Sequence, residues 1–95
     1  MGFLRAWQSR RRTQALETRR EQQREDGAYA AQTMRAFLAG TGGPHDWDAF
    51  TSCSLRDPQV DRIRKLAAAV DLPVDGEGRA TLEVLAEQAE RLAQS

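Results

Sequence analysis

The 95-residue sequence has almost no cysteine or histidine and lacks long apolar runs. It contains one cysteine and one histidine, so an intramolecular disulfide is excluded, and a lone cysteine is typical of a reducing compartment. No apolar run approaches the roughly 20 residues that a membrane-spanning helix needs. Arg5 follows directly on Phe3 and Leu4 and interrupts the apolar stretch expected of a signal peptide. These absences predict a cytoplasmic protein.

Lysine and proline are also scarce. Lys65 is the only lysine beside thirteen arginines, which is typical of a GC-rich coding sequence and therefore predicts a bacterial origin. Of the three prolines, Pro44 and Pro58 lie in residues 37–58, which we call the central segment. This segment also holds three of the seven glycines and the only histidine and cysteine. Because proline and glycine are the strongest helix breakers, the sequence predicts helix on both sides of it.

The formal net charge of zero is a cancellation between two unequal parts. Residues 1–24 contain seven arginines and two glutamates, a net charge of +5. Residues 25–95 contain seven basic and twelve acidic side chains, a net charge of −5. Such an asymmetry indicates either an anionic partner or an arm that packs on an acidic body.

Residues 1–39 are predicted to form one long helical stretch, since they lack proline and are rich in good helix formers. Between Gln8 and Asp26 the only apolar residues are Ala15 and Leu16, so this part has no coiled-coil seam. A helix that is polar all round either spans solvent or is unstable alone.

Gly27 is expected to mark a break in this stretch, because glycine costs up to about 1 kcal/mol relative to alanine inside a helix. The sequence therefore predicts a basic, mostly polar helical arm over residues 1–26 and a small helical domain over residues 27–95. Within that domain, apolar residues at helical spacing predict that the end of the first helix packs into the core: Tyr29, Ala30, Met34, Phe37 and Leu38.

Two further helices are predicted after the central segment. Gly40 is a natural left-handed cap for the first helix, and Asp57 with Pro58 is a strong helix start. The helix after Pro58 has an apolar stripe of Val60, Ile63, Leu66, Ala67 and Val70, with Asp61, Arg62, Arg64 and Lys65 expected on its exposed side. A turn over residues 75–78, with glycines at positive φ, precedes a last helix over residues 79–93, where Val84 and Ala86 are expected at the margin of the apolar face.

The predicted fold is all-α, with a long N-terminal helix packed on an antiparallel helix pair and a Gly-rich connecting loop between them. The short connection between the last two helices favours the antiparallel pair. The expected core consists of Tyr29, Met34, Phe37, Trp47, Phe50, Ile63, Leu66, Leu82 and Leu85.

His45, Asp46 and Asp48 form the most suggestive chemical cluster. A histidine and two carboxylates offer metal ligands or an acid–base pair, but contiguous residues point in different directions and no second cluster supports them. We expect Trp47 and Phe50 to anchor the loop while the aspartates cap a short helical turn or other backbone N–H groups. Cys53 is expected to be a small buried apolar residue. No catalytic residue, metal site or cofactor is predicted.

Two glycine-rich stretches lack the residues that their chemistry requires. After Gly42 and Gly43, a phosphate-binding loop needs Lys and Ser or Thr, but Pro44 and His45 follow. The stretch 75–78 does not fit a calcium-binding loop, because aligning Gly78 with the obligatory glycine puts a proline at the first ligand position.

The basic arm is the best candidate for a binding surface. Arginines from residues 5–24 suit phosphates, while the apolar tip suits a protein surface or, less well, an anionic membrane surface. The interleaved glutamates favour a protein partner or self-association over nucleic acid. The predicted interaction residues are Phe3, Leu4, Trp7, Arg10, Arg11 and Arg12 of the arm, with His45, Asp46 and Asp48 of the loop.

The central segment resembles a group of short, uncharacterised bacterial proteins that share an FLxGxGGxxDWDxF-type motif. Here the motif reads FLAGTGGPHDWDAF from Phe37 to Phe50, followed by the helix start at Asp57 and Pro58. The resemblance covers roughly residues 37–75 and implies that the loop is a recurring module, but it implies no activity. The function predicted from the sequence is a small non-enzymatic interaction or accessory protein. The alternative is a nucleic-acid-associated regulator.

Overall fold

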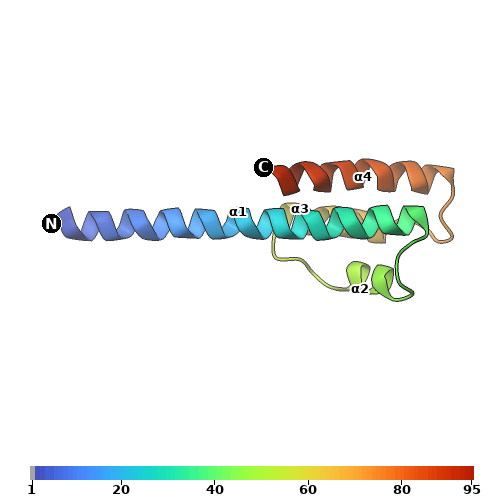
Figure 1. The fold of residues 1–95 in the computed structure, drawn as a ribbon, viewed down its shortest axis with the longest axis horizontal. Helices are drawn as coiled ribbons and strands as arrows, with labels where there is room; N and C mark the ends of the chain where they lie inside the picture. The colour runs from blue at the N-terminus through green and yellow to red at the C-terminus, as the bar shows by residue number, and fades with distance from the viewer. Residues whose placement is uncertain (1) are drawn as a thin grey trace.

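The structure is a computed structural model that describes the backbone of residues 2–95 and the side chains of residues 14–95. Over the described backbone the chain forms α1 (Gly2–Ala39), α2 (Asp46–Ser52), α3 (Pro58–Ala68) and α4 (Gly76–Gln94). The all-α prediction is therefore confirmed (Figure 1). In this part of the chain, no helix combines the length and the apolarity needed to cross a membrane.

The long helix α1 determines the shape of the molecule, which measures 62 × 21 × 20 Å. α1 packs mainly against α4, and α3 contacts both of these helices. Figure 1 shows α4 running back along the C-terminal half of α1, so that the C-terminus lies near the middle of α1. The N-terminal half of α1 extends beyond the other helices. The body of the protein is thus built around only half of its longest helix.

The predicted break at Gly27 is wrong, because α1 continues through this residue without interruption. Gly27 is buried where α1 crosses the end of α4. A Cβ atom at this position would lie 2.8 Å from the carbonyl oxygen of Ala89 and 2.9 Å from the backbone nitrogen of Ala93. Glycine is therefore present to allow two helix backbones to approach closely.

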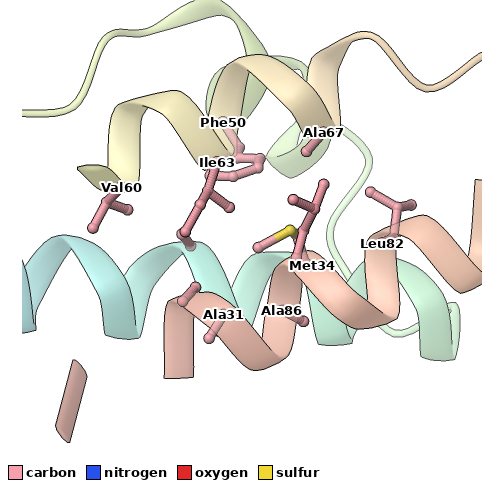
Figure 2. Packing of buried hydrophobic residues seen from close by; sticks show 11 residues of the cluster. Ala31, Met34, Phe50, Val60, Ile63, Ala67, Leu82 and Ala86 are labelled. Carbon is pink, nitrogen blue, oxygen red and sulfur yellow. The ribbon is translucent and has the colours of Figure 1, made fainter. Parts of the chain in front are cut away.

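The core is made largely of small residues. Figure 2 shows Met34 and Ala31 of α1 packed beside Ala86 and Leu82 of α4. Small alanine side chains on both helices allow their axes to approach closely. The buried apolar residues are Ala30, Ala31, Met34, Phe50, Val60, Ile63, Ala67, Leu82, Leu85, Ala86 and Ala89.

The predicted core is confirmed for Met34, Phe50, Ile63, Leu82 and Leu85, while Phe37 and Trp47 are only half-buried. Two members of that set are wrong. Tyr29 is 43% exposed and Leu66 is 49% exposed. Ala86, expected at the margin, is fully buried instead. The alanines take the central positions because the closely spaced helices leave no room for larger side chains there.

The start of α3 is as predicted and the start of α4 is not. The carboxylate of Asp57 accepts a hydrogen bond from the Val60 N–H at 3.0 Å, with Pro58 at the first helical position. α4 begins at Gly76 rather than at residue 79, because the Asp75 carboxylate caps the Gly78 N–H at 2.7 Å. The glycines of this turn lie inside the helix, and of the glycines described only Gly40 has a positive φ. The expectation of positive φ at residues 75–78 is wrong.

Candidate interaction site

The projecting half of α1 is the first surface to consider. The predicted tip residues Phe3, Leu4, Trp7, Arg10, Arg11 and Arg12 lie outside the described side chains. The side chains of residues 14–21 are described, and all of them are exposed, including Arg19 and Arg20. Leu16, the one large apolar residue among them, is 54% exposed. This part of α1 presents its whole circumference to solvent.

The arm meets the body at Gln23. Its amide nitrogen donates a hydrogen bond to the side-chain oxygen of Gln59 at 2.7 Å, at the start of α3. Its amide oxygen accepts a hydrogen bond from the Ser95 hydroxyl at 3.2 Å, at the end of α4. α4 therefore ends opposite Gln23.

A buried polar junction lies one turn further along α1. The carboxylate of Asp26, only 6% exposed, accepts a hydrogen bond from the backbone N–H of Asp57 at 2.8 Å. Its other oxygen accepts from the Arg56 guanidinium at 3.0 Å, and Arg56 also bonds to the exposed Glu25 at 2.8 Å. Asp26 thus holds the start of α3 against α1. Both of its carboxylate oxygens accept hydrogen bonds from within the chain, so this junction is structural.

The central segment begins with a well-formed helix end. Gly40, with φ of +72°, lets its own N–H bond to the Phe37 carbonyl at 3.2 Å. The Thr41 N–H bonds to the Ala36 carbonyl at 2.9 Å, which completes the two-bond left-handed cap found after many helices. The prediction of Gly40 as the left-handed cap is confirmed.

Aromatic stacking fixes the loop that follows. The rings of Phe37 and Trp47 stack with centroids 4.0 Å apart and an interplanar angle of 18°. Trp47 also packs on Phe50, and Phe50 makes an edge contact with Tyr29 at 5.8 Å. Stacked aromatic pairs contribute about 0.5–1.5 kcal/mol beyond their buried area. α2 is therefore held rigidly against the C-terminal half of α1.

His45, Asp46 and Asp48 are brought together in sequence only, and all three are exposed. Asp46 accepts a hydrogen bond from the Gly43 N–H at 2.8 Å, so it shapes the loop. The N-cap of α2 is His45, without a side-chain cap, so the expectation that an aspartate caps this helix is wrong, whereas the expectation that an aspartate caps another backbone N–H is confirmed for Asp46. Among residues 14–95, no three His, Cys, Asp or Glu side chains are grouped closely enough to hold a metal ion.

Two further expectations for this region are wrong. Cys53, expected to be buried, is exposed at the end of α2. Arg64, expected on the exposed side of α3, is only 7% exposed. Its guanidinium donates to the Thr51 carbonyl at 2.7 Å and to Asp61 at 2.7 Å, so it takes the position beneath the end of α2. A long side chain with a charged end can reach such a carbonyl from a half-buried stem.

Arg64 and Asp61 together form a clamp on the end of α2 and the loop after it. Asp61 accepts the Arg64 hydrogen bond and also one from the Leu55 backbone N–H at 2.9 Å. These two interactions, with that of Arg64 the larger, lower the pKa of Asp61 below its ordinary value. This clamp joins both α2 and the loop over residues 53–57 to α3.

A groove of about 540 Å³ runs between α1 and α4 on the side away from the aromatic loop residues. Alanines form much of its floor and walls, and an ion pair of 2.7 Å between Arg35 and Glu90 crosses it. Its lining consists of Ala28, Ala31, Gln32, Arg35, Ala36, Ala39, Thr41, Glu90, Ala93 and Gln94. Sequence reasoning missed this groove. The signal for it was the repeated alanine at three- to five-residue spacing after Gly27, which reads equally well as ordinary helix.

An acidic row borders this groove on α4. Glu83, Glu87 and Glu90 follow one another at spacings of four and three residues, which places them on one face of the helix. The hydrogen bond of Glu90, followed by the charges of Glu87 and Glu83, raises the pKa of Arg35. All three glutamates therefore lie near the same guanidinium at the edge of the groove.

Comparison with known proteins adds no relative to this description, since no protein-family model, curated protein or solved structure matches the chain.

Proposed function

We propose that the protein is a small, non-enzymatic interaction protein that binds a protein partner. The observation that carries this proposal is the exposed half of α1, which extends from the body and has no large apolar face of its own over residues 14–21. A polar helix of this kind gains little from its own propensity and most from contacts with another surface. A partner supplies those contacts.

The loop at the other end of α1 supports the same proposal as a second, smaller contact surface. The stacked pair of Phe37 and Trp47 anchors the backbone of the loop that carries His45 and Asp48, so binding there needs little backbone ordering. The resemblance of residues 37–75 to short bacterial proteins is consistent with such a recurring contact module. We also propose that α3 and α4 form the antiparallel helix pair that their short connection predicts.

The alternative partner is a nucleic acid. Arg19, Arg20 and Arg24 are exposed on the arm and favour contact with phosphates. Glu17, Glu21 and Glu25 lie between them and weaken the positive field. A protein partner with its own charged groups matches this mixed pattern better than a uniformly negative backbone.

Affinity capture tests the proposal. The full chain is compared with a variant lacking residues 2–20, which keeps the contacts of Gln23 and Asp26 with the body. We expect the full chain to retain a protein that the shortened chain loses. A third chain carrying His45→Ala and Asp48→Lys tests the loop, with Asp46 kept because it supports Gly43.

The proposal fails if the full chain binds no protein, itself included, at low salt. Binding of nonspecific DNA or RNA that weakens steeply as salt rises supports the alternative instead.

A further inference from the structure

The side of α1 that faces α4 continues beyond the end of α4. Gly27, Ala31 and Met34 are the buried residues of this side, at spacings of four and three. The same spacing extended toward the N-terminus reaches Arg24 and Arg20, and both are exposed. Since α4 ends opposite Gln23, Arg24 lies level with the last turn of α4, and Arg20 lies beyond its end. The α1–α4 seam thus changes from apolar and occupied to basic and open.

The acidic row of α4 is complementary to this basic side. Glu83 and Glu87 are four residues apart, as are Arg20 and Arg24, so two helices side by side can align both pairs. All four side chains are exposed. Within the chain, the row is only partly neutralised, through Arg35 on Glu90 and a long 3.9 Å contact of Arg91 with Glu87. The opposite net charges of residues 1–24 and 25–95 follow the same division.

The lengths also match. At 1.5 Å per residue, the 38-residue α1 is about 57 Å long and the 19-residue α4 is about 28 Å long. The part of α1 before Gln23 is therefore about as long as α4. Each chain has one open helix segment and one acidic row, on either side of the middle of α1. A two-fold axis close to Gly27, which lies against Ala89 and Ala93 of α4, places Arg20 and Arg24 of one chain level with Glu83 and Glu87 of its partner.

We propose that the partner of the arm is a second copy of this chain. Two α1 helices lie antiparallel, and the arm of each lies along the groove between α1 and α4 of the other, with Arg20 and Arg24 facing the acidic row. The alanines of the groove allow the arm to approach closely once the exposed Arg35–Glu90 ion pair that crosses the groove moves aside. This inference rests on the proposed function and names the partner. The contact is reciprocal, so each chain contributes one arm and one acidic row.

The test uses the full chain in sedimentation equilibrium. At low ionic strength we expect twice the monomer mass of 10.6 kDa, and at about 1 M salt, where screening acts over about 3 Å, a shift toward monomer. The first variant, Arg20→Glu with Arg24→Glu, reverses the arm. The second, Glu83→Lys with Glu87→Lys, reverses α4. We expect each variant alone to be monomeric.

Mixing the two variants gives the decisive result. The reversed arm of the first then meets the reversed α4 of the second, and the unchanged arm of the second meets the unchanged α4 of the first. We expect the equimolar mixture to regain the dimer mass. A control chain with Arg62→Glu and Lys65→Glu carries an equal charge change on exposed positions of α3 and is expected to dimerise like the wild type. Circular dichroism verifies that every variant is helical.

A wild-type chain that is monomeric at low salt overturns the inference, as does a dimer that neither charge-reversed variant weakens. These outcomes are distinct from failure of the proposed function. A monomer that captures a different protein through residues 2–20 disproves self-association and leaves the proposed function standing. A chain that neither dimerises nor captures a protein disproves both.

Discussion

At the scale of single residues, the fold depends on positions where backbone or charge is buried. Gly27 gives up helix propensity so that α1 can touch α4, with backbone atoms 2.8–2.9 Å from the position of a Cβ. Asp26 is buried away from water, and its carboxylate instead accepts a hydrogen bond from the Asp57 N–H. Each residue is unfavourable when considered alone, and each is compensated by a contact with a segment far away in the sequence.

Gly27→Ala is expected to destabilise the protein by about 1–3 kcal/mol, since the obstructing atoms belong to backbone and cannot rotate away. Helix propensity alone predicts the reverse, a gain of about 1 kcal/mol. Gly76→Ala is the matched control, because a Cβ there meets nothing within 4 Å and stability is expected to stay level or rise slightly. Urea denaturation measures both. A stabilised Gly27→Ala variant contradicts the close approach of α1 and α4.

Asp26→Ala is expected to lower the free energy of unfolding by about 2–3 kcal/mol, because it leaves the buried Asp57 N–H without an acceptor. Glu25→Ala removes the other carboxylate that Arg56 contacts. That pair is exposed, so the expected loss is under about 1 kcal/mol. If thermal or urea unfolding shows equal losses of stability for Asp26→Ala and Glu25→Ala, the junction is not held by Asp26.

Sequence patterns predicted residues whose environment is local and missed those whose environment is distant. The cap at Asp57 and the left-handed Gly40 are encoded within four residues of themselves, and both were predictable. Gly27 and Arg64 were not, because the atoms that explain them belong to Ala89 and Thr51. Nothing in the local sequence separates a packing glycine from a helix-breaking glycine.

At the scale of elements, α2 is a short helix fixed at both ends. Stacking of Trp47 on Phe37 holds its start, and the Arg64 hydrogen bond to the Thr51 carbonyl holds its end. Seven residues are too few to be helical alone, so these attachments determine whether α2 forms. The conformation of the segment that contains His45, Asp46 and Asp48 therefore depends on the contacts of Trp47 and Thr51.

The clamp on α2 gives the stability of the protein a pH dependence. The pKa of Asp61 is lowered in the folded state, so its contribution is complete above the unfolded value of about 4 and is lost as pH falls further through the folded value. We expect Asp61→Asn to be less stable than wild type at pH 6 and the difference to narrow below about pH 4. Urea denaturation at both pH values measures this. A difference that stays constant down to pH 2 rules out the coupling.

The existence of each helix was predictable, whereas the choice of neighbours was not. Periodic apolar residues and caps identified all four helical regions, including the short turn at Trp47. The main contact of α1 with α4 depends on small residues, Ala31, Ala86 and Ala89 among them, which carry little weight in an apolar pattern. Alanine is a common helix former everywhere, so its role in helix contact appears only once the helices are placed.

At the scale of the whole molecule, the separation of charge and the separation of contacts coincide. Most of the basic stretch, residues 2–22, lies on the half of α1 that extends from the body, and the acidic excess lies on residues 25–95. The sequence left open whether the arm folds back on its own acidic body. A straight, uninterrupted α1 excludes that arrangement, because an arm in the same helix cannot reach α4 of its own chain. Contact between the arm and the acidic row of an α4 helix therefore requires a second molecule, as proposed above.

Small-angle scattering of the monomer tests this rigidity. At about 1 M salt, where charge-driven association is screened, we expect a radius of gyration close to the Cα value of 16.9 Å. A compact chain of the same length has a radius of about 12 Å. Glu21→Pro, which interrupts α1 at an exposed position just before its contacts with the body, provides the contrast, since it frees the arm to bend and is expected to lower the radius. A wild-type radius near 12 Å shows the arm folded back on its own chain and removes the basis for an exchange of arms between copies.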